Sequence, residues 1–178
     1  RFDKGFCSGN GFERVEYNQN SILFGFLEDL EDFVKGSQKA DLVICSANIV
    51  FELNAQQEVI TRLQPIVRRL GCPLVVVNRC GAEGRFVFNG GSFVLQANGN
   101  LAEELPLFDA QTTVVETQKL KNLQKNPLSK PEKLYRASVL GIRDYYHKNN
   151  IKKAVIGLSG GIDSALVVVL AVEALGKE

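Results

Sequence analysis

The most informative stretch of the sequence is Gly157-Leu158-Ser159-Gly160-Gly161-Ile162-Asp163-Ser164. An apolar run at 154–156 precedes it and predicts a short buried strand, and a longer apolar run at 165–172 follows it and predicts a buried helix. The expected local structure is therefore a strand, a glycine-rich loop and a helix.

Such a loop is suited to binding an anion. Gly160 and Gly161 have no Cβ, so we expect left-handed backbone angles and a close approach to a ligand. The first turn of the following helix offers free N–H groups and a positive dipole end. Ser159 and Ser164 add hydroxyl groups, whereas Asp163 would repel a bare phosphate unless a cation lay between them. The sequence thus predicts a nucleotide site with Mg²⁺.

Two other glycine loops do not fit. A Walker-type loop has a Lys before its Ser or Thr, whereas here Asp163 precedes Ser164, and the dinucleotide fingerprint G-x-G-x-x-G does not match residues 157–162. The stretch instead resembles the S-G-G-x-D-S loop of the ATP pyrophosphatases, which split ATP between the α- and β-phosphates and leave an adenylated substrate. An ordinary strand-turn-helix connection with glycines for tight packing is the alternative.

The residues around the loop indicate which family of this class the sequence resembles. The segments 134–145, 154–166 and 174–176 resemble the start of the synthetase domain of the glutamine-dependent NAD synthetase family. The related GMP and asparagine synthetases share the loop and are the alternative within this class. The run Arg143-Asp144-Tyr145 before the loop is similar to the NAD enzymes.

This resemblance implies an activity and a set of site residues. The family uses ATP and Mg²⁺ to adenylate nicotinic acid adenine dinucleotide, and ammonia, normally released from glutamine, then displaces the nucleotide to give NAD. Asp163 is the implied metal ligand. The implied ATP-binding residues are Gly157, Leu158, Ser159, Gly160, Gly161, Ile162, Asp163 and Ser164.

The same family carries a nitrilase-type glutaminase domain before the synthetase domain. The segment Phe24-Gly25-Phe26-Leu27-Glu28-Asp29-Leu30 resembles the one that holds its cysteine nucleophile, and Leu27 stands at the cysteine position. Leucine cannot form a thioester. Ala55 and Val59 stand near the places of two basic residues that help to hold glutamine. The resemblance therefore implies an inactive glutaminase, so that no catalytic residue is assigned.

Two alternatives to the ligase remain open. One is a non-catalytic scaffold remnant, and the other is an independent amidase, for which the required cysteine is not found at the expected place. In either case the fold class expected is α/β, with the C-terminal part of a nitrilase-like α/β sandwich followed by the first strand, loop and helix of a doubly wound, Rossmann-like domain.

The expected organisation is a nitrilase-like part at 1–117, a linker at 118–130 and the start of a synthetase domain at 131–178. The resemblance implies a segment truncated at both ends, from a protein that forms homo-oligomers. The periodicity and turn residues predict strands at 12–17, 21–27, 40–46, 74–78 and 112–116, a hairpin at 86–96, and helices at 52–70 and 131–148.

Composition argues against two kinds of partner. The 178 residues have a net charge of +1 with acids and bases interspersed, which gives no basic surface for nucleic acid or membrane. No apolar run approaches the roughly 20 residues of a membrane span, and the charged opening Arg1-Phe2-Asp3-Lys4 is not a signal peptide. The four cysteines, without a C-x-x-C pair, are expected to be reduced and mostly buried in a cytoplasmic protein.

Overall fold

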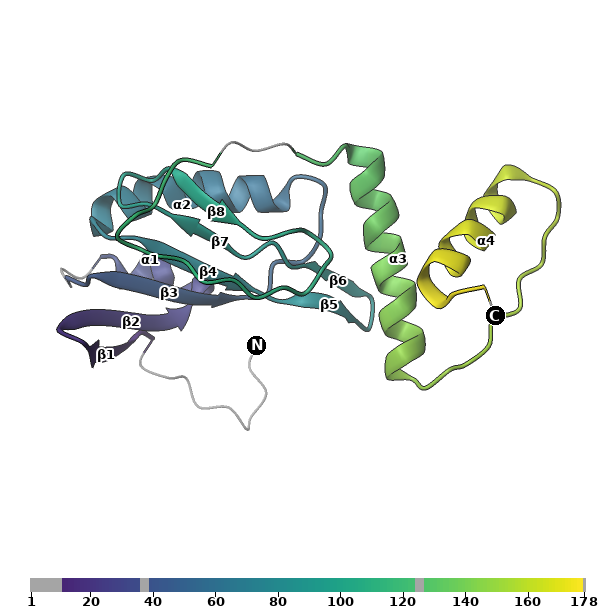
Figure 1. Ribbon diagram of the computed structural model, residues 1–178, viewed down its shortest axis with the longest axis horizontal. Helices are drawn as coiled ribbons and strands as arrows, with labels where there is room; N and C mark the ends of the chain where they lie inside the picture. The colour runs from purple at the N-terminus through teal and green to yellow at the C-terminus, as the bar shows by residue number, and fades with distance from the viewer. Residues whose placement is uncertain (1–10, 36–38, 124–126, 178) are drawn as a thin grey trace.

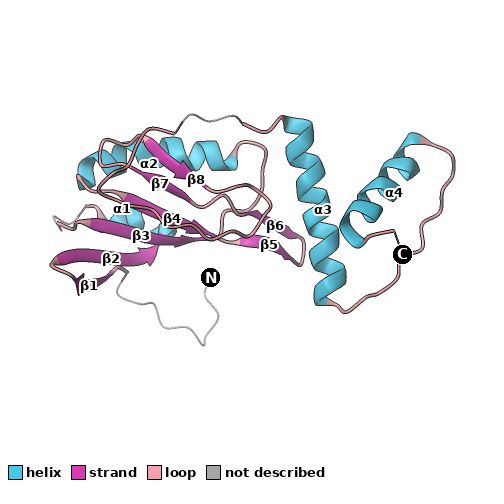
Figure 2. Ribbon diagram, viewed as in Figure 1, coloured by secondary structure: helices cyan, strands magenta, loops and turns pink. Residues whose placement is uncertain are grey.

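A computed structural model describes residues 11–35, 39–123 and 127–177. A six-stranded sheet lies at one end of the molecule, helix α3 (Lys130–Lys148) stands beside it, and helix α4 (Ile162–Leu175) lies on the far side of α3 (Figure 1). The mixture of helices and strands confirms the expected α/β class (Figure 2).

The central sheet has the strand order β1-β2-β3-β4-β7-β8. The three strands β2, β3 and β4 run parallel, and the other neighbours are antiparallel. The strands are β1 (Glu13–Tyr17), β2 (Asn20–Phe26), β3 (Leu42–Ala47), β4 (Leu74–Asn78), β7 (Phe93–Leu95) and β8 (Leu101–Glu104). A separate hairpin consists of β5 (Cys80–Glu83) and β6 (Phe86–Asn89).

Two helical segments cover one face of the sheet. A 3-10 turn, η1 (Leu27–Asp29), leads into the short helix α1 (Leu30–Phe33), and α2 (Ala55–Leu70) follows β3. Helix α2 ends at Gly71, whose φ of 72° is the left-handed conformation that glycine adopts most readily. The predicted helix at 52–70 therefore forms, beginning three residues later than expected.

The main core lies between these helices and the sheet. Alternate residues of each strand point to the same face, so the buried positions recur with a period of two. Leu30 and Val34 pack onto this core from the α1 segment, and Ile60, Leu63 and Val67 from α2. The sheet contributes Leu23, Val43, Cys45, Ala47, Leu74, Val76, Phe93 and Leu95.

Two sequence predictions about strands before residue 120 are wrong. The segment 86–96 is not one hairpin, because β6 pairs with β5 while β7 pairs with β4 and β8. Gly90 and Gly91, both with positive φ, redirect the chain between the two sheets. Residues 112–116 form no strand. They instead line a surface cavity beside β4 and β7.

None of the described helices is long and apolar enough to cross a membrane.

Three cysteines lie among the described residues, and all three are free thiols. Burial, with a smaller contribution from Glu28, raises the pKa of Cys45 to about 12. Burial and then Asp41 raise the pKa of Cys72 to about 11. Cys80 is only half-buried, and burial raises its pKa as well. Cys7 lies outside the described residues.

These environments predict an order of thiol reactivity. Cys80 should be alkylated first in the native protein at pH 8, because a thiol with a pKa three units above its ordinary value has about a thousandfold less thiolate. Cys45 and Cys72 should react only as the protein unfolds. Peptide mapping after timed iodoacetamide treatment checks this order, with the denatured protein as control. Alkylation of Cys45 as fast as Cys80 would contradict the burial described here.

The same thiols make stability depend on pH. Their pKa values are higher in the folded than in the unfolded chain, so the folded state keeps protons that the unfolded state loses as the pH rises above about 9. The stabilisation from Cys45 and Cys72 is therefore complete below pH 9 and is lost between about pH 9 and their folded pKa values of about 12 and 11.

Candidate functional site

The predicted phosphate loop precedes α4. Gly160 has a φ of 85°, in the left-handed region, and Gly161 is extended and forms the N-cap of the helix. The prediction of left-handed angles is therefore confirmed for Gly160 and wrong for Gly161. A side chain at Gly157 or Gly160 would meet no atom within 4 Å, so space alone does not require glycine at either position. At Gly160 the requirement is conformational.

The loop brings two of the predicted hydroxyl groups together. Ser159 Oγ and Ser164 Oγ lie 3.1 Å apart, and Ser164 Oγ also donates to the carbonyl of Gly161. The first helical backbone bond runs from Ala165 N to the carbonyl of Gly161. The N–H groups of the three residues before Ala165 consequently have no acceptor within the helix. These donors and hydroxyls, all within one turn, suit a phosphate group.

Asp163 stands in the first turn of α4 and is exposed. Its carboxylate is favoured by the positive end of the helix dipole. No group of three potential metal ligands occurs among the described side chains. A cation at this loop would therefore take oxygen ligands from Asp163, from the serine hydroxyls and from a bound phosphate, a set that matches the preference of Mg²⁺.

The flanks of the loop differ from the sequence prediction. Residues 154–156 form no strand, and Val155 is fully exposed. The helix after the loop forms, but none of its residues is buried, and Leu166, Val167, Val169 and Val172 are exposed. The physical reason is the same in both cases. No described strand lies beside 151–160 to accept its backbone hydrogen bonds, and no sheet covers the outer face of α4.

The position at which the resemblance expects a nucleophile, Leu27, lies where the parallel strands end. Leu27 follows β2, Asn48 follows β3 and Asn78 ends β4, so these residues share the carboxyl edge of the sheet. Ligand sites of open α/β sheets lie at this edge. The side chain of Leu27 is only 6% exposed and belongs to the main core. Its role in this structure is packing.

The positions expected to hold glutamine carry no charge. Ala55 is the first residue of α2 and Val59 packs against the main core. Asn78, which sequence analysis assigned to a strand without a role, organises this edge. Its side chain accepts from Ile49 N at 2.9 Å and donates to the carbonyl of Gly90 at 2.6 Å. In the sequence Asn78 is an asparagine at the end of an apolar strand. This pattern does not predict a buried hydrogen bond, because the partners Ile49 and Gly90 are known only from the structure.

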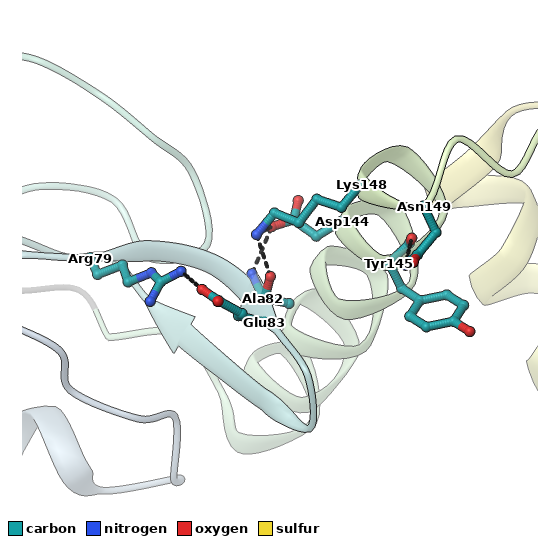
Figure 3. A network of polar contacts seen from close by, with 7 residues as sticks. All are labelled: Arg79, Ala82, Glu83, Asp144, Tyr145, Lys148 and Asn149. Carbon is teal, nitrogen blue, oxygen red and sulfur yellow. Dashed lines mark hydrogen bonds and ion pairs between the residues drawn. The ribbon is translucent and has the colours of Figure 1, made fainter. Parts of the chain in front are cut away.

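Helix α3 makes contacts that sequence analysis did not foresee. Asp144 Oδ2 accepts a hydrogen bond from Ala82 N at 2.6 Å, and Lys148 Nζ donates to the carbonyl of Ala82 (Figure 3). Near its other end, Lys133 Nζ donates to the carbonyl of Leu53 at 3.1 Å. Tyr145 and His147 are both exposed. No sequence signal could have paired Asp144 with Ala82, which is 62 residues away.

Comparison with known proteins identifies the family of this chain. The family model for NAD synthase matches residues 134–178. A glutamine-dependent NAD(+) synthetase of Synechocystis is 34% identical over 99% of this chain and 35% of its own length. One of Rhodobacter capsulatus is 39% identical over 62% of this chain and 21% of its own length. The chain thus spans about a third or less of these curated relatives.

Solved structures give the same result. A glutamine-dependent NAD⁺ synthetase of Acinetobacter baumannii, in complex with ADP, superposes with a TM-score of 0.83 at 27% identity, over 96% of this chain and 34% of that one. A CN-hydrolase superfamily protein of Xanthomonas campestris matches 60% of this chain and 43% of its own, with a TM-score of 0.51 at 21% identity, which shows the fold alone. Over the segment it spans, this chain belongs to the glutamine-dependent NAD(+) synthetase family.

Proposed function

We propose that Gly157 to Ser164 bind the phosphates of ATP in an NAD synthetase. The observation that carries the proposal is the left-handed turn at Gly160 directly before the free N–H groups of α4. The Ser159 and Ser164 hydroxyls, 3.1 Å apart, add neutral donors. The family match over residues 134–178 and the ADP bound by the Acinetobacter relative support the choice of nucleotide.

Asp163 would hold Mg²⁺ together with oxygens of the nucleotide. One carboxylate is enough for this role, since Mg²⁺ in nucleotide sites usually takes one or two carboxylates plus phosphate oxygens. The ion supplies positive charge that stabilises the departing pyrophosphate. The chain's own contribution is fixed donors aimed at the phosphates, which act electrostatically and need no covalent step.

For the whole protein we propose ATP-dependent amidation of nicotinic acid adenine dinucleotide to NAD, in a cytoplasmic homo-oligomer. The apolar residues Phe24, Phe26 and Val77 are exposed on the sheet face that α1 and α2 leave open. They support burial of that face against further protein, within the full-length subunit or across a subunit contact.

The nitrilase-like part is proposed to be inactive as a glutaminase. Leu27 has no nucleophilic atom, and the neighbouring thiol of Cys45 cannot replace it, because burial keeps it protonated. The two expected basic positions are the apolar residues Ala55 and Val59. Free ammonia, or ammonia from another protein, would then be the nitrogen source.

Asp163→Asn should abolish Mg²⁺-dependent binding of ATP and of pyrophosphate, because the amide is a weaker cation ligand and carries no charge. Isothermal titration with each ligand, with and without Mg²⁺, measures this. Glu173→Gln is the matched control, since it removes a carboxylate from the same helix at its other end. Unchanged binding in Asp163→Asn would remove the metal role of this residue.

The nitrogen donor should be ammonia alone. We expect the longest natural form of the protein to convert nicotinic acid adenine dinucleotide to NAD with ATP and ammonium, and to show no activity with glutamine. Chromatographic measurement of the NAD formed with ammonium and with glutamine distinguishes the two nitrogen donors. Activity with glutamine would show that Leu27 is not at the nucleophile position, and no activity with either donor would favour a scaffold role.

Leu27→Cys should not restore glutaminase activity. A cysteine at this buried position would stay protonated, and the shorter side chain would leave a small cavity that costs about 2 kcal/mol of unfolding free energy. Glutamate release from glutamine measures the activity, and chemical denaturation measures the stability. Glutamine hydrolysis by this variant would show that the rest of the pocket is intact.

A further inference from the structure

Helix α3 carries residues of the synthetase resemblance, yet it packs on the nitrilase-like part. Ala137 and Leu140 of α3 form a second hydrophobic cluster with Phe108, and Phe51 and Val87 pack against it. A Cβ on Gly141 would lie 3.5 Å from Val87, an ordinary van der Waals distance, so this turn of α3 lies directly against β6. The helix is therefore docked on the β5–β6 hairpin through a buried apolar surface.

Polar contacts between α3 and the backbone of β5 also hold the helix in place. Ala82 presents both its N–H and its carbonyl on the outer edge of β5, away from β6. Asp144 accepts from the N–H at 2.6 Å, Lys148 donates to the carbonyl, and the two side chains lie 3.6 Å apart (Figure 3). An unpaired strand edge would otherwise expose these backbone groups. Two adjacent turns of α3 thus contact both polar groups of one residue.

The hairpin is shaped to receive the carboxylate. A Cβ on Gly81 would lie only 2.8 Å from Asp144 Oδ2, and Gly81 has a φ of 130°. A Cβ at this position would displace Asp144 Oδ2 from where it accepts the Ala82 N–H, and the positive φ also favours glycine. Gly81 therefore suits the present position of the Asp144 carboxylate.

A second anchor fixes the direction of the helix. Lys133 Nζ donates to the carbonyl of Leu53, four turns before Lys148, so that the two anchors are about 22 Å apart along α3. Helix α4 rests on the opposite side, where Leu166 and Leu170 share an apolar groove with Leu134. The position of the phosphate loop therefore depends on how α3 is held.

We propose that Asp144 and Lys148 form a clamp on Ala82 that fixes α3, and with it the Gly157–Ser164 loop, on the nitrilase-like part. Both are positioning residues, and their binding surface is the outer edge of β5. The consequence for nucleotide binding rests on the proposed function, whereas the clamp itself does not. An inactive glutaminase part would then retain a role as the platform of the synthetase part.

Hydrogen–deuterium exchange of the whole chain tests the clamp without any nucleotide. Asp144→Ala should raise exchange about tenfold in peptides covering 80–84 and 137–148, because a hydrogen bond to a charged group is lost. Peptides of α2 should not change. Glu132→Gln is the matched control, since it removes a carboxylate in the first turn of α3 that pairs with Arg136 and lies about three turns from Asp144. Unchanged or uniformly raised exchange in Asp144→Ala would overturn the proposal.

A double-mutant cycle provides a second, independent readout. Gly81→Ala should lower the folding equilibrium constant about tenfold or more, through backbone strain and the contact with Asp144. In the Asp144→Ala background the contact is gone and only the strain remains, so the loss should be at least about threefold smaller. Gly84→Ala, at a positive φ with no atom within 4 Å, is the control for a hairpin glycine. Additive effects would overturn the clamp.

Nucleotide binding separates the clamp from the proposed function. If both hold, Asp144→Ala should weaken Mg²⁺-ATP binding severalfold while Asp163→Asn abolishes it. If the unmodified chain binds no Mg²⁺-ATP, the proposed function fails, and the exchange and cycle measurements still decide the clamp. Wild-type affinity in Asp144→Ala, with locally raised exchange, would overturn the positioning role for the loop.

Discussion

Packing of α1 and α2 against one face of the six-stranded sheet is the interaction on which the rest of the structure depends. It requires the parallel strands β2, β3 and β4 to be in register, because a slip of one residue would move every core side chain to the open face. The same register places Leu27, Asn48 and Asn78 at one edge. The arrangement of residues at this edge is therefore fixed by the packing of the core.

Helix α3 connects this body to the phosphate loop. Its inner face shares a hydrophobic cluster with Phe108, and its polar residues contact the backbone of β5. Backbone contacts of this kind do not depend on the side chain of Ala82, so they place the helix without restricting the residue type at position 82. The sheet and its hairpin can in this way determine the orientation of the helix that leads to the loop.

The loop at 157–164 is open, whereas the carboxyl edge of the sheet is filled. Every residue of the loop except Ser164, which is half-buried, is exposed, and its donors are free to meet a large polyanion. At the sheet edge, by contrast, a core leucine and a satisfied asparagine occupy the available space. The two regions therefore differ in physical character: the loop offers the free N–H groups at the start of α4, whereas the sheet edge presents a buried leucine and an asparagine with hydrogen-bond partners.

The sequence by itself determined most of the local elements and the residue types that the loop presents. Period-two and helical spacing located β2, β3, β4, α2 and α3, and Gly71 marked the end of α2, because these signals act over a few residues. The tertiary structure decided the rest. Only it separated β6 from β7, left 154–156 without a partner strand and joined Asp144 to Ala82, since strand pairing and packing depend on residues far apart in the chain.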